Sequence, residues 1–255
     1  MTNYGLQIVE PTSEDYMFGG VAQLGGEVLV PDGQWDEWVP QDETQNLATE
    51  PLACVSFATL NCIEILERQE YGKTDNWSDR FLAYISGTNQ NGNNPNTVSE
   101  TLRKKGVVPE EYWAYTQEDN TWDKFYASPP SNLYTKALEF IAEYSYGHEW
   151  VNTDQQSMID ALMYSPLGVA GFAWAQDTDG FYITPEGTQP CHYFVVYGYD
   201  RNNYWKVFDS YTNTHKKLRW DYKFSMIKKY TLHRQVVNES AWQKFLSLMK
   251  QILGI

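Results

Sequence analysis

One cysteine stands where a helix is expected to begin. Cys54 follows Pro51 and opens a run whose apolar residues recur at three- and four-residue spacing, with no Gly or Pro before Gly72. This spacing predicts a buried helix with Cys54 in or near its first turn. The positive end of a helix dipole favours a thiolate over a thiol. Cys54 is therefore a candidate nucleophile; the alternative is a buried cysteine that only packs.

A nucleophilic cysteine needs a base within hydrogen-bond reach, and the base needs a group that orients it. The chain has four histidines, and three of them, His148, His215 and His233, are expected at the surface. His192 differs because it begins the strongest β pattern in the chain, 138 residues after Cys54. We predict that His192 is the base, against the alternative of a structural histidine at a strand start.

A carboxylate follows at the end of the next β pattern. Asp209 lies 17 residues after His192, and a short loop at 200–203 fits a hairpin between the two strands. Such a hairpin would bring Asp209 beside His192, where it would fix the imidazole tautomer and stabilise the imidazolium. The alternative reading of Asp209 is a turn residue.

The elements that must position these groups divide along the chain. Apolar periodicity and capping patterns predict helices from 54, from 97 to 106, from 133 to 144 and from 153 to 163, with a polar loop at 89–96. Period-two patterns predict strands at 167–173, 193–199, 204–208, 218–222 and 225–232. Short strands are also expected at 21–26 and 27–30, around a Gly-Gly turn. The N-terminal half is thus predicted to be helical and the C-terminal half β.

A last amphipathic helix is predicted beyond these strands, from about 240 to 255. Its apolar stripe comprises Trp242, Phe245, Leu246, Met249, Ile252 and Leu253. The stripe either docks on the domain or forms an interface for self-association or for a partner.

Composition limits the class of protein. The chain has 255 residues, 16% aromatic residues and a net charge of −14. This is a globular composition, and the negative charge argues against nucleic acid or an anionic membrane as partner. Three cysteines give neither a disulfide framework nor a paired metal motif. With no signal peptide and no long apolar run, a cytoplasmic protein is expected, with association with a virus particle left open.

These motifs together resemble the papain-like cysteine peptidases, over about residues 36 to 232. Ala53-Cys54-Val55-Ser56-Phe57-Ala58 stands where that family carries its nucleophile, and 39–45 is similar to its lead-in to an oxyanion-hole glutamine, here Gln45. The segment 192–199 is similar to the family's histidine strand, and Asp209-Ser210-Tyr211 stands at its Asn-Ser-Trp. The gap from Cys54 to His192 falls within the roughly 130–150 residues typical of the papain type.

The resemblance implies a set of site residues. Cys54, His192 and Asp209 would form the triad, and Gln45 with the Cys54 backbone N–H would form the oxyanion hole. Gly92 and Asn93 stand in the family's substrate-binding loop, and Cys191 precedes the histidine, so the resemblance makes these three substrate-binding. Compact, disulfide-free forms look most like those of bacteria and their phages.

The chain also departs from the family pattern. Gln45 lies nine residues before Cys54, more than the family's gap, so an insertion is expected at 46–50. Asn93 replaces the second glycine of the substrate-binding loop, and Asp209 replaces an asparagine. The arm 1–44 is too short for an independent inhibitory domain, so we read it as part of the fold. The resemblance then implies constitutive activity, another control or none.

The resulting prediction is an α+β, papain-like two-lobed fold with an antiparallel β-sheet or barrel in its second lobe. The peptidase domain spans 1–235, divided into an N-terminal arm (1–44), a mainly helical lobe (45–165) and a β lobe (166–235), and the terminal helix spans 236–255. The predicted function is hydrolysis of peptide or isopeptide bonds, including those of a cell-wall peptide, with no metal or cofactor and with a peptide or protein substrate. The alternative is a catalytically silent module that assembles into a larger particle, for example that of a phage.

Overall fold

One antiparallel sheet and a group of helices pack on opposite sides of a central helix. The computed structural model describes residues 4–211 and 214–235. Its helices are α1 (Cys54–Tyr71), α2 (Asp79–Ile85), α3 (Pro95–Lys105), α4 (Trp122–Phe125), α5 (Asn132–Glu143) and α6 (Gln155–Leu162), with 3-10 turns η1 (Asp36–Trp38) and η2 (Glu110–Tyr112). Its strands are β1 (Tyr144–Trp150), β2 (Leu167–Gly171), β3 (His192–Asp200), β4 (Tyr204–Phe208), β5 (His215–Arg219) and β6 (Ile227–Arg234).

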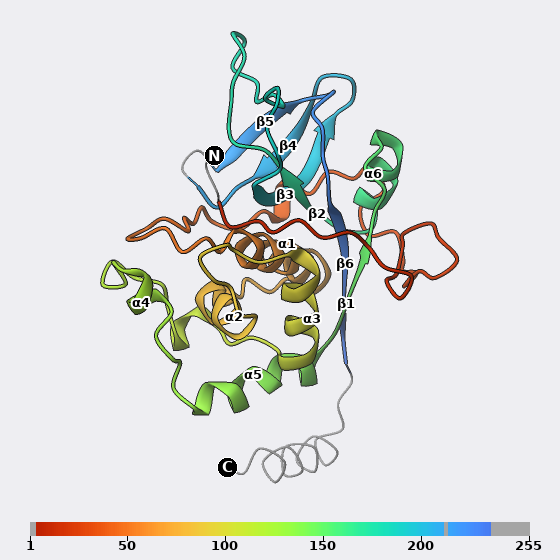
Figure 1. Ribbon diagram of the computed structural model, residues 1–255. Coiled ribbons are helices and arrows are strands. Elements are labelled where there is room, and N and C mark those ends of the chain that lie inside the picture. Colours follow the sequence, from red (N-terminus) through yellow and green to blue (C-terminus); the bar gives the residue numbers. More distant parts are fainter. Residues whose placement is uncertain (1–3, 212–213, 236–255) are drawn as a thin grey trace.

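The strands form one sheet in the order β1-β6-β2-β3-β4-β5, with every neighbouring pair antiparallel. α1 lies against β3, while α2 and α3 pack on its other side (Figure 1). Residues 54–67 of α1 are all buried. This burial explains the near-continuous apolar run of the central helix: it meets the sheet on one face and helices on the other. The predicted α+β, two-lobed architecture is confirmed.

Several predicted elements match closely. α1 begins at Cys54, and the αL residue Gly72 ends it, as its sequence indicated. β4 spans the predicted residues. α5 differs from its prediction by one residue at each end, and α6 begins two residues later and ends one residue earlier than predicted. At α3 the predicted start at Thr97 is wrong, because the helix begins at Pro95. Its cap is Asn94, whose side chain accepts from the Thr97 backbone N–H at 2.9 Å. Asparagine is as good a cap as threonine, and proline suits the first helical position.

The border between the helical and β parts is also different from the prediction. The predicted helix 133–144 ends one residue early, and Tyr144–Trp150 forms edge strand β1, which pairs with β6. His148 is therefore buried on this strand, not at the surface. The strands expected at 21–26 and 27–30 do not form. Val21, Leu24 and Val28 are exposed, so this stretch has no apolar surface to pair against.

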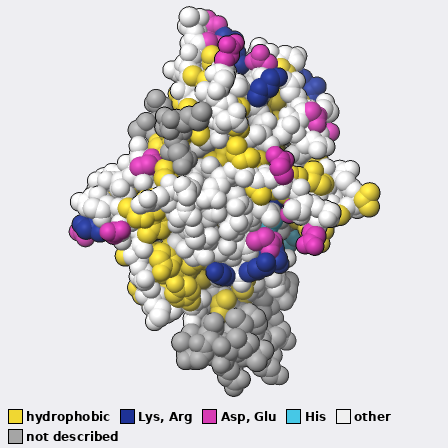
Figure 2. Space-filling model, in the orientation of Figure 1, with side chains coloured by type: hydrophobic (Ala, Val, Ile, Leu, Met, Phe, Trp, Pro, Cys, Tyr) yellow, Lys and Arg dark blue, Asp and Glu magenta, His cyan; other side chains and the backbone are white. Residues whose placement is uncertain are grey.

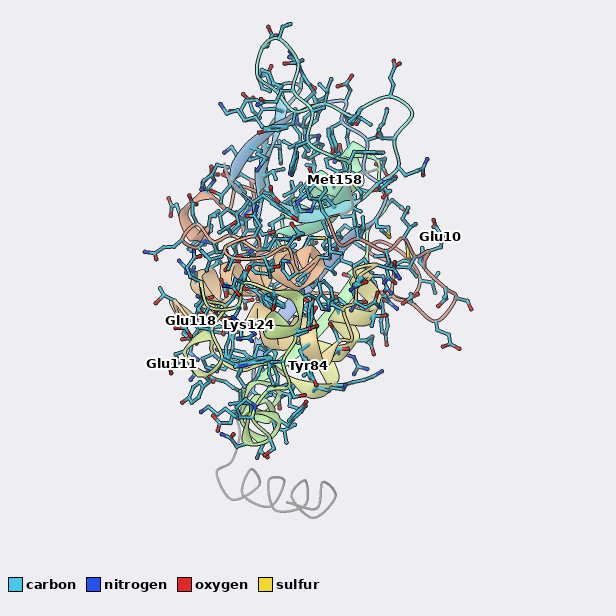
Figure 3. All side chains as sticks on the ribbon, turned by 60° about the vertical axis from the view of Figure 1, so that its left-hand side comes forward. Glu10, Tyr84, Glu111, Glu118, Lys124 and Met158 are labelled. Carbon is cyan, nitrogen blue, oxygen red and sulfur yellow. The ribbon has the colours of Figure 1, made fainter. Side chains whose placement is uncertain are left out.

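The N-terminal arm and α6 pack against the two lobes. The arm, red in Figure 1, crosses between the helices and the sheet, and α6 packs beside β2. Glu111, Glu118 and Lys124 mark the segment between α3 and α5, at the outer edge of the helical lobe, and Met158 lies above it on α6 (Figure 3). The predicted terminal helix at 236–255 lies outside the described residues. No helix in the described part of the chain is both long and apolar enough to cross a membrane.

Carboxyl groups are buried along α1, which makes stability depend on pH. Glu67 is fully buried and accepts a hydrogen bond from the Trp77 indole N–H at 2.6 Å. Burial raises its pKa to about 7, although hydrogen bonds from Trp77 and Tyr144 act in the opposite direction. Burial likewise raises the pKa values of Glu64 and Asp79. These carboxyl groups are more easily protonated in the folded chain than in the unfolded chain.

We expect Glu67→Gln to remove part of this pH dependence. Wild-type Glu67 contributes stability that is fully present below pH 4.5 and is lost as the pH rises to about 7. A shift of that size corresponds to about 3 kcal/mol. Urea unfolding at pH 4.5 and pH 7.5 should therefore show the wild type losing about 3 kcal/mol relative to the variant. Burial lowers the pKa of His148 to about 4, so its contribution to stability increases as the pH rises, opposite to that of Glu67. The quantity to compare is therefore the difference in unfolding free energy between the wild type and Glu67→Gln at each pH. An equal change in both chains would contradict the prediction.

Candidate active site

The start of α1 carries the predicted nucleophile, the start of β3 carries the predicted base, and these two elements pack against each other. Cys54 is the first residue of α1, and His192 is the first residue of β3; both side chains are fully buried. The backbone N–H of Tyr193, next to His192, acts to lower the pKa of the Cys54 thiol, against the effect of burial. The packing of α1 on β3 therefore places the thiol beside the histidine strand.

The hairpin of β3 and β4 places the orienting carboxylate as predicted. His192 Nε2 lies 2.6 Å from Asp209 Oδ1, and both groups are buried. The other ring nitrogen, Nδ1, is buried and has no hydrogen-bond partner among the described residues. One ring nitrogen is thus held by a carboxylate, and the other remains available for proton transfer.

A lysine completes the charge balance of this pair. Lys216 on β5 donates to Asp209 Oδ2 at 2.7 Å. Burial by itself would raise the pKa of Asp209, but the charges of His192 and Lys216 and their hydrogen bonds lower it below its ordinary value. The lowered pKa keeps Asp209 ionised beside the His192 ring. The sequence pattern did not single out Lys216, because it becomes a neighbour of Asp209 only through the turn after β4.

Aromatic rings enclose the imidazole. The rings of Tyr4, Trp174 and Tyr211 lie 5.0, 5.5 and 5.2 Å from that of His192, measured between centroids. Tyr211 stands where the related motif has tryptophan. Tyr4, from the arm, was not predicted to be near the site. These rings fix the plane of the imidazole and keep water away from its bond to Asp209.

Gln45, the predicted oxyanion-hole residue, is hydrogen-bonded to the segment that follows Asp209. Its backbone N–H donates to the Ser210 carbonyl at 2.7 Å, and its side-chain carbonyl accepts from the Ser210 hydroxyl at 2.8 Å. Gln45 is thereby tied to the residue that follows Asp209 and is fully buried. Its side-chain nitrogen faces Tyr211 and Glu50, at 2.7 and 2.9 Å.

The electrostatics of the thiol differ from the expectation at a helix N-terminus. Burial raises the pKa of Cys54 well above its ordinary range, and the nearby Glu50, Asp209 and Cys191 charges act in the same direction. Desolvation of a thiolate thus outweighs the helix dipole in this arrangement. Cys62 is buried deeper in α1 and burial raises its pKa too, whereas Cys191 is only half-buried.

The predicted substrate-binding residues lie together, but the chain itself occupies their backbone groups. Asn93 pairs with the arm: its N–H donates to the Gly5 carbonyl at 2.9 Å, and its carbonyl accepts from Gln7 N–H at 2.8 Å. The Cys191 carbonyl accepts from Tyr4 N–H at 3.1 Å. The Gly92 carbonyl accepts from the Gln7 side chain at 2.7 Å. These carbonyl and amide groups are therefore able to bind an extended peptide.

No group of three His, Cys, Asp or Glu side chains among residues 4–211 and 214–235 is arranged to hold a metal ion. A thiol, an imidazole and a carboxylate are the groups that acyl transfer through a thioester uses.

Comparison with known proteins gives a fold relationship across a large difference in sequence. Neither a family model nor a curated protein sequence matches this chain. Xylellain, a cysteine protease from Xylella fastidiosa, superposes with a TM-score of 0.66 at 15% identity, over 92% of this chain and 97% of its own. Digestive procathepsin L 3 of Tenebrio molitor gives 0.59 at 17% identity, over 80% and 71%. The cysteine protease CMS1MS2 of Carica candamarcensis gives 0.59 at 16%, over 78% and 96%. The chain has the fold of the papain-like cysteine peptidases.

Proposed function

We propose that the chain is a cysteine peptidase that hydrolyses peptide bonds with Cys54, His192 and Asp209. The observation that carries this proposal is the bond of His192 Nε2 to the buried Asp209. It leaves Nδ1 without a partner among the described residues, at the start of the strand on which the Cys54 helix packs. Two of the structural neighbours named above, xylellain and CMS1MS2, are called cysteine proteases, which supports the same class of reaction.

The reaction follows from the roles of these groups. His192 Nδ1 takes the thiol proton as Cys54 Sγ bonds to the substrate carbonyl carbon, and the carbonyl oxygen becomes an oxyanion. The first backbone N–H groups of α1 have no partner within the helix, so the Cys54 N–H is available to this oxyanion, with the Gln45 side chain as second donor. His192 then gives its proton to the departing amine as the C–N bond breaks, which leaves a thioester on Cys54.

Water completes the cycle. His192 removes a proton from a water molecule, the resulting hydroxide adds to the thioester carbonyl, and the C–S bond breaks with return of a proton to the thiolate. Asp209 keeps the imidazole in one orientation through both steps and balances its charge when protonated. One donor of an oxyanion hole contributes roughly 3 kcal/mol in comparable enzymes.

A peptide library and a thiol-directed probe test the proposal. The full chain and Gly5→Ala, which changes the arm beside the site, are each incubated with blocked fluorogenic peptides and with a peptidyl epoxide. We expect release of the fluorophore and attachment of the epoxide to Cys54, both lost in Cys54→Ala. If neither chain cleaves any peptide and the epoxide never attaches to Cys54, the fold is catalytically silent, as in the assembly-module alternative.

A further inference from the structure

A lysine occupies an inward-facing position on β5. Lys216 and Leu218 are buried in this strand, whereas His215 and Lys217 are exposed. Alternate residues of a strand face opposite sides of a sheet, so Lys216 shares the buried side with Leu218. Lysine and arginine side chains are visible at the surface in Figure 2, coloured dark blue, whereas Lys216 is only 4% exposed. A buried ammonium is unfavourable unless a partner compensates its charge.

Asp209 compensates this charge. Lys216 Nζ donates to Asp209 Oδ2 at 2.7 Å, while Asp209 Oδ1 lies 2.6 Å from His192 Nε2. The sheet order explains this arrangement, because β4, which ends just before Asp209, pairs with β3 on one side and with β5 on the other. The Asp209 backbone N–H also donates to the Thr214 carbonyl at 2.9 Å, which fixes Asp209 to the segment just before β5. The carboxylate therefore stands between an ammonium and the imidazole.

One aromatic ring contacts both ends of this arrangement. The Trp174 ring centroid lies 5.5 Å from that of His192 and 4.8 Å from Lys216 Nζ. The loop that carries Trp174 is held on β5, since the Tyr182 N–H donates to the Lys217 carbonyl at 2.9 Å. The Tyr182 ring lies 5.0 Å from that of Trp174 and 5.8 Å from Lys216 Nζ. Covered by these rings, the ammonium is weakly screened by water, so its charge acts strongly on Asp209 and His192.

The neighbouring thiols and phenols carry no charge at neutral pH, because burial raises the pKa of each of them. They come from the arm, from α1 and from loops of the β lobe: Tyr4, Cys54, Tyr182, Cys191, Tyr211 and Tyr222. The Glu50 carboxyl is also nearby, but its oxygens bond Gln45 and Tyr211. The charge of Asp209 is thus offset by Lys216.

The charge at this position matters for the base. A lone carboxylate beside His192 would hold a proton on the imidazole, because an opposite charge within about 4–6 Å favours the charged form. An imidazole that keeps its proton cannot take one from the Cys54 thiol. The related Asn-Ser-Trp motif has no such charge, since asparagine is neutral. Lys216, on the far oxygen of Asp209, cancels most of the attraction that the carboxylate would otherwise exert.

We propose that Lys216 is a positioning residue of the active site. Its ammonium holds the Asp209 carboxylate in place and offsets its charge, so that the two side chains together present to His192 the neutral acceptor that an asparagine presents in the related motif. The proposal rests on the proposed function, since it assigns how the base of that same site is tuned. Residues 209 and 216 then form one unit, in which a change of charge at one position requires a change at the other.

The pH at which His192 takes up its proton measures this effect without an assay of activity. Heteronuclear NMR follows the ring nitrogens over a series of pH values, and the His192 signals are those absent from His192→Ala. Lys216→Met should raise this midpoint by at least about one pH unit, a tenfold change in proton affinity. Asp209→Asn should lower it, because the ammonium then acts unopposed, and the imidazole stays uncharged and able to accept a proton at neutral pH. The double variant Asp209→Asn/Lys216→Met should return close to the wild-type midpoint.

Two variants serve as controls. Lys217→Met removes the same charge from the next residue of β5, whose side chain is exposed and lies 4.6 Å from the Tyr204 ring centroid. Water screens that charge, so the midpoint of His192 should not move. Lys216→Arg keeps the charge and should keep the wild-type midpoint. Circular dichroism verifies that each variant is folded. If Lys216→Met is not, the comparison of Asp209→Asn with the double variant carries the same test, since removal of the ammonium must raise the midpoint there too.

Activity provides a second measurement in any chain that cleaves peptides. The pH profile of kcat/KM should move in the same direction as the NMR midpoint in each variant, because His192 must change its protonation state during the reaction. KM should stay unchanged in Lys216→Met, since the buried Lys216 side chain does not touch the substrate.

The outcomes separate this proposal from the proposed function. Equal midpoints in the wild type, Lys216→Met and Lys217→Met would overturn the role of Lys216, whether or not peptides are cleaved. If peptides are cleaved and the pH profile of Lys216→Met equals that of the wild type, the peptidase function stands and the tuning role is wrong. If the midpoints shift in opposite directions and cancel in the double variant, but no chain cleaves a peptide, Lys216 sets the proton affinity of His192 as proposed, and it is the peptidase function that fails.

Discussion

His192→Ala should lower kcat for peptide hydrolysis by about 10²- to 10⁴-fold, the usual contribution of a positioned general base. The imidazole is the group that takes the thiol proton and returns it to the leaving amine. Because burial raises the pKa of Cys54, the thiol has little thiolate of its own at neutral pH and depends on this base. The measurement is steady-state hydrolysis of one fluorogenic peptide, in whichever chain, wild type or Gly5→Ala, is active.

Two comparisons make the result specific. The double variant Cys54→Ala/His192→Ala should be no less active than the worse single variant, because nucleophile and base act as a unit. Asp209→Asn should retain most of the activity, since an amide oxygen still accepts from His192 Nε2, as in the related Asn-Ser-Trp motif. Asp209→Ala should lose more. A His192→Ala chain with wild-type kcat would show that His192 is a structural residue.

Arg80→Ala should destabilise the fold by about 3–5 kcal/mol, the usual effect of removing one member of a buried ion pair. Arg80 on α2 is 6% exposed, and its guanidinium pairs with Asp119 at 2.9 Å and stacks on Trp113. It also donates to the carbonyl groups of Ala114, Lys124 and Phe125. Its removal would leave a buried carboxylate and three carbonyl groups without their donor.

The effect should extend to the site. Arg80 fixes the segment from 114 to 125, which positions Tyr115 and Tyr126 on the loop before Cys54. Urea denaturation measures the free energy of unfolding, and iodoacetamide reports access to Cys54 in the folded variant. Arg80→Lys should recover only part of the loss, because an ammonium cannot reproduce the planar fork. Arg103→Ala removes a half-exposed pair with Glu100 and should change stability by less than about 1 kcal/mol. If Arg80→Ala also lowers the free energy of unfolding by less than about 1 kcal/mol, Arg80 does not stabilise the fold as a buried ion pair.

The sequence by itself determined the parts of this protein that depend on local pattern. The helix at Cys54 follows from its apolar period, and the strands that carry His192 and Asp209 follow from a period of two and a hairpin loop. Because a hairpin has only one short way to close, these local features were enough to pair His192 with Asp209, which the structure places 2.6 Å apart. The resemblance then supplied the fold and the place of Gln45.

Tertiary structure alone decided the remaining features. Tyr144–Trp150 forms a strand because β6 offers an edge to pair with, and the paired residues lie 78 (Trp150 to Lys228) to 90 (Tyr144 to Arg234) residues apart in sequence. Lys216 becomes the second partner of Asp209 through the turn between β4 and β5, and Tyr4 and Glu50 reach Gln45 from irregular segments. The conformation of such turns and loops leaves no periodic signal in the sequence. The arm looked like a simple extension because its contacts with Cys191 and Asn93 use backbone N–H and carbonyl groups, which leave no side-chain signal in the sequence. Gly5 and Gly92 let these backbones meet, and only the segment packed against each of them makes glycine necessary there.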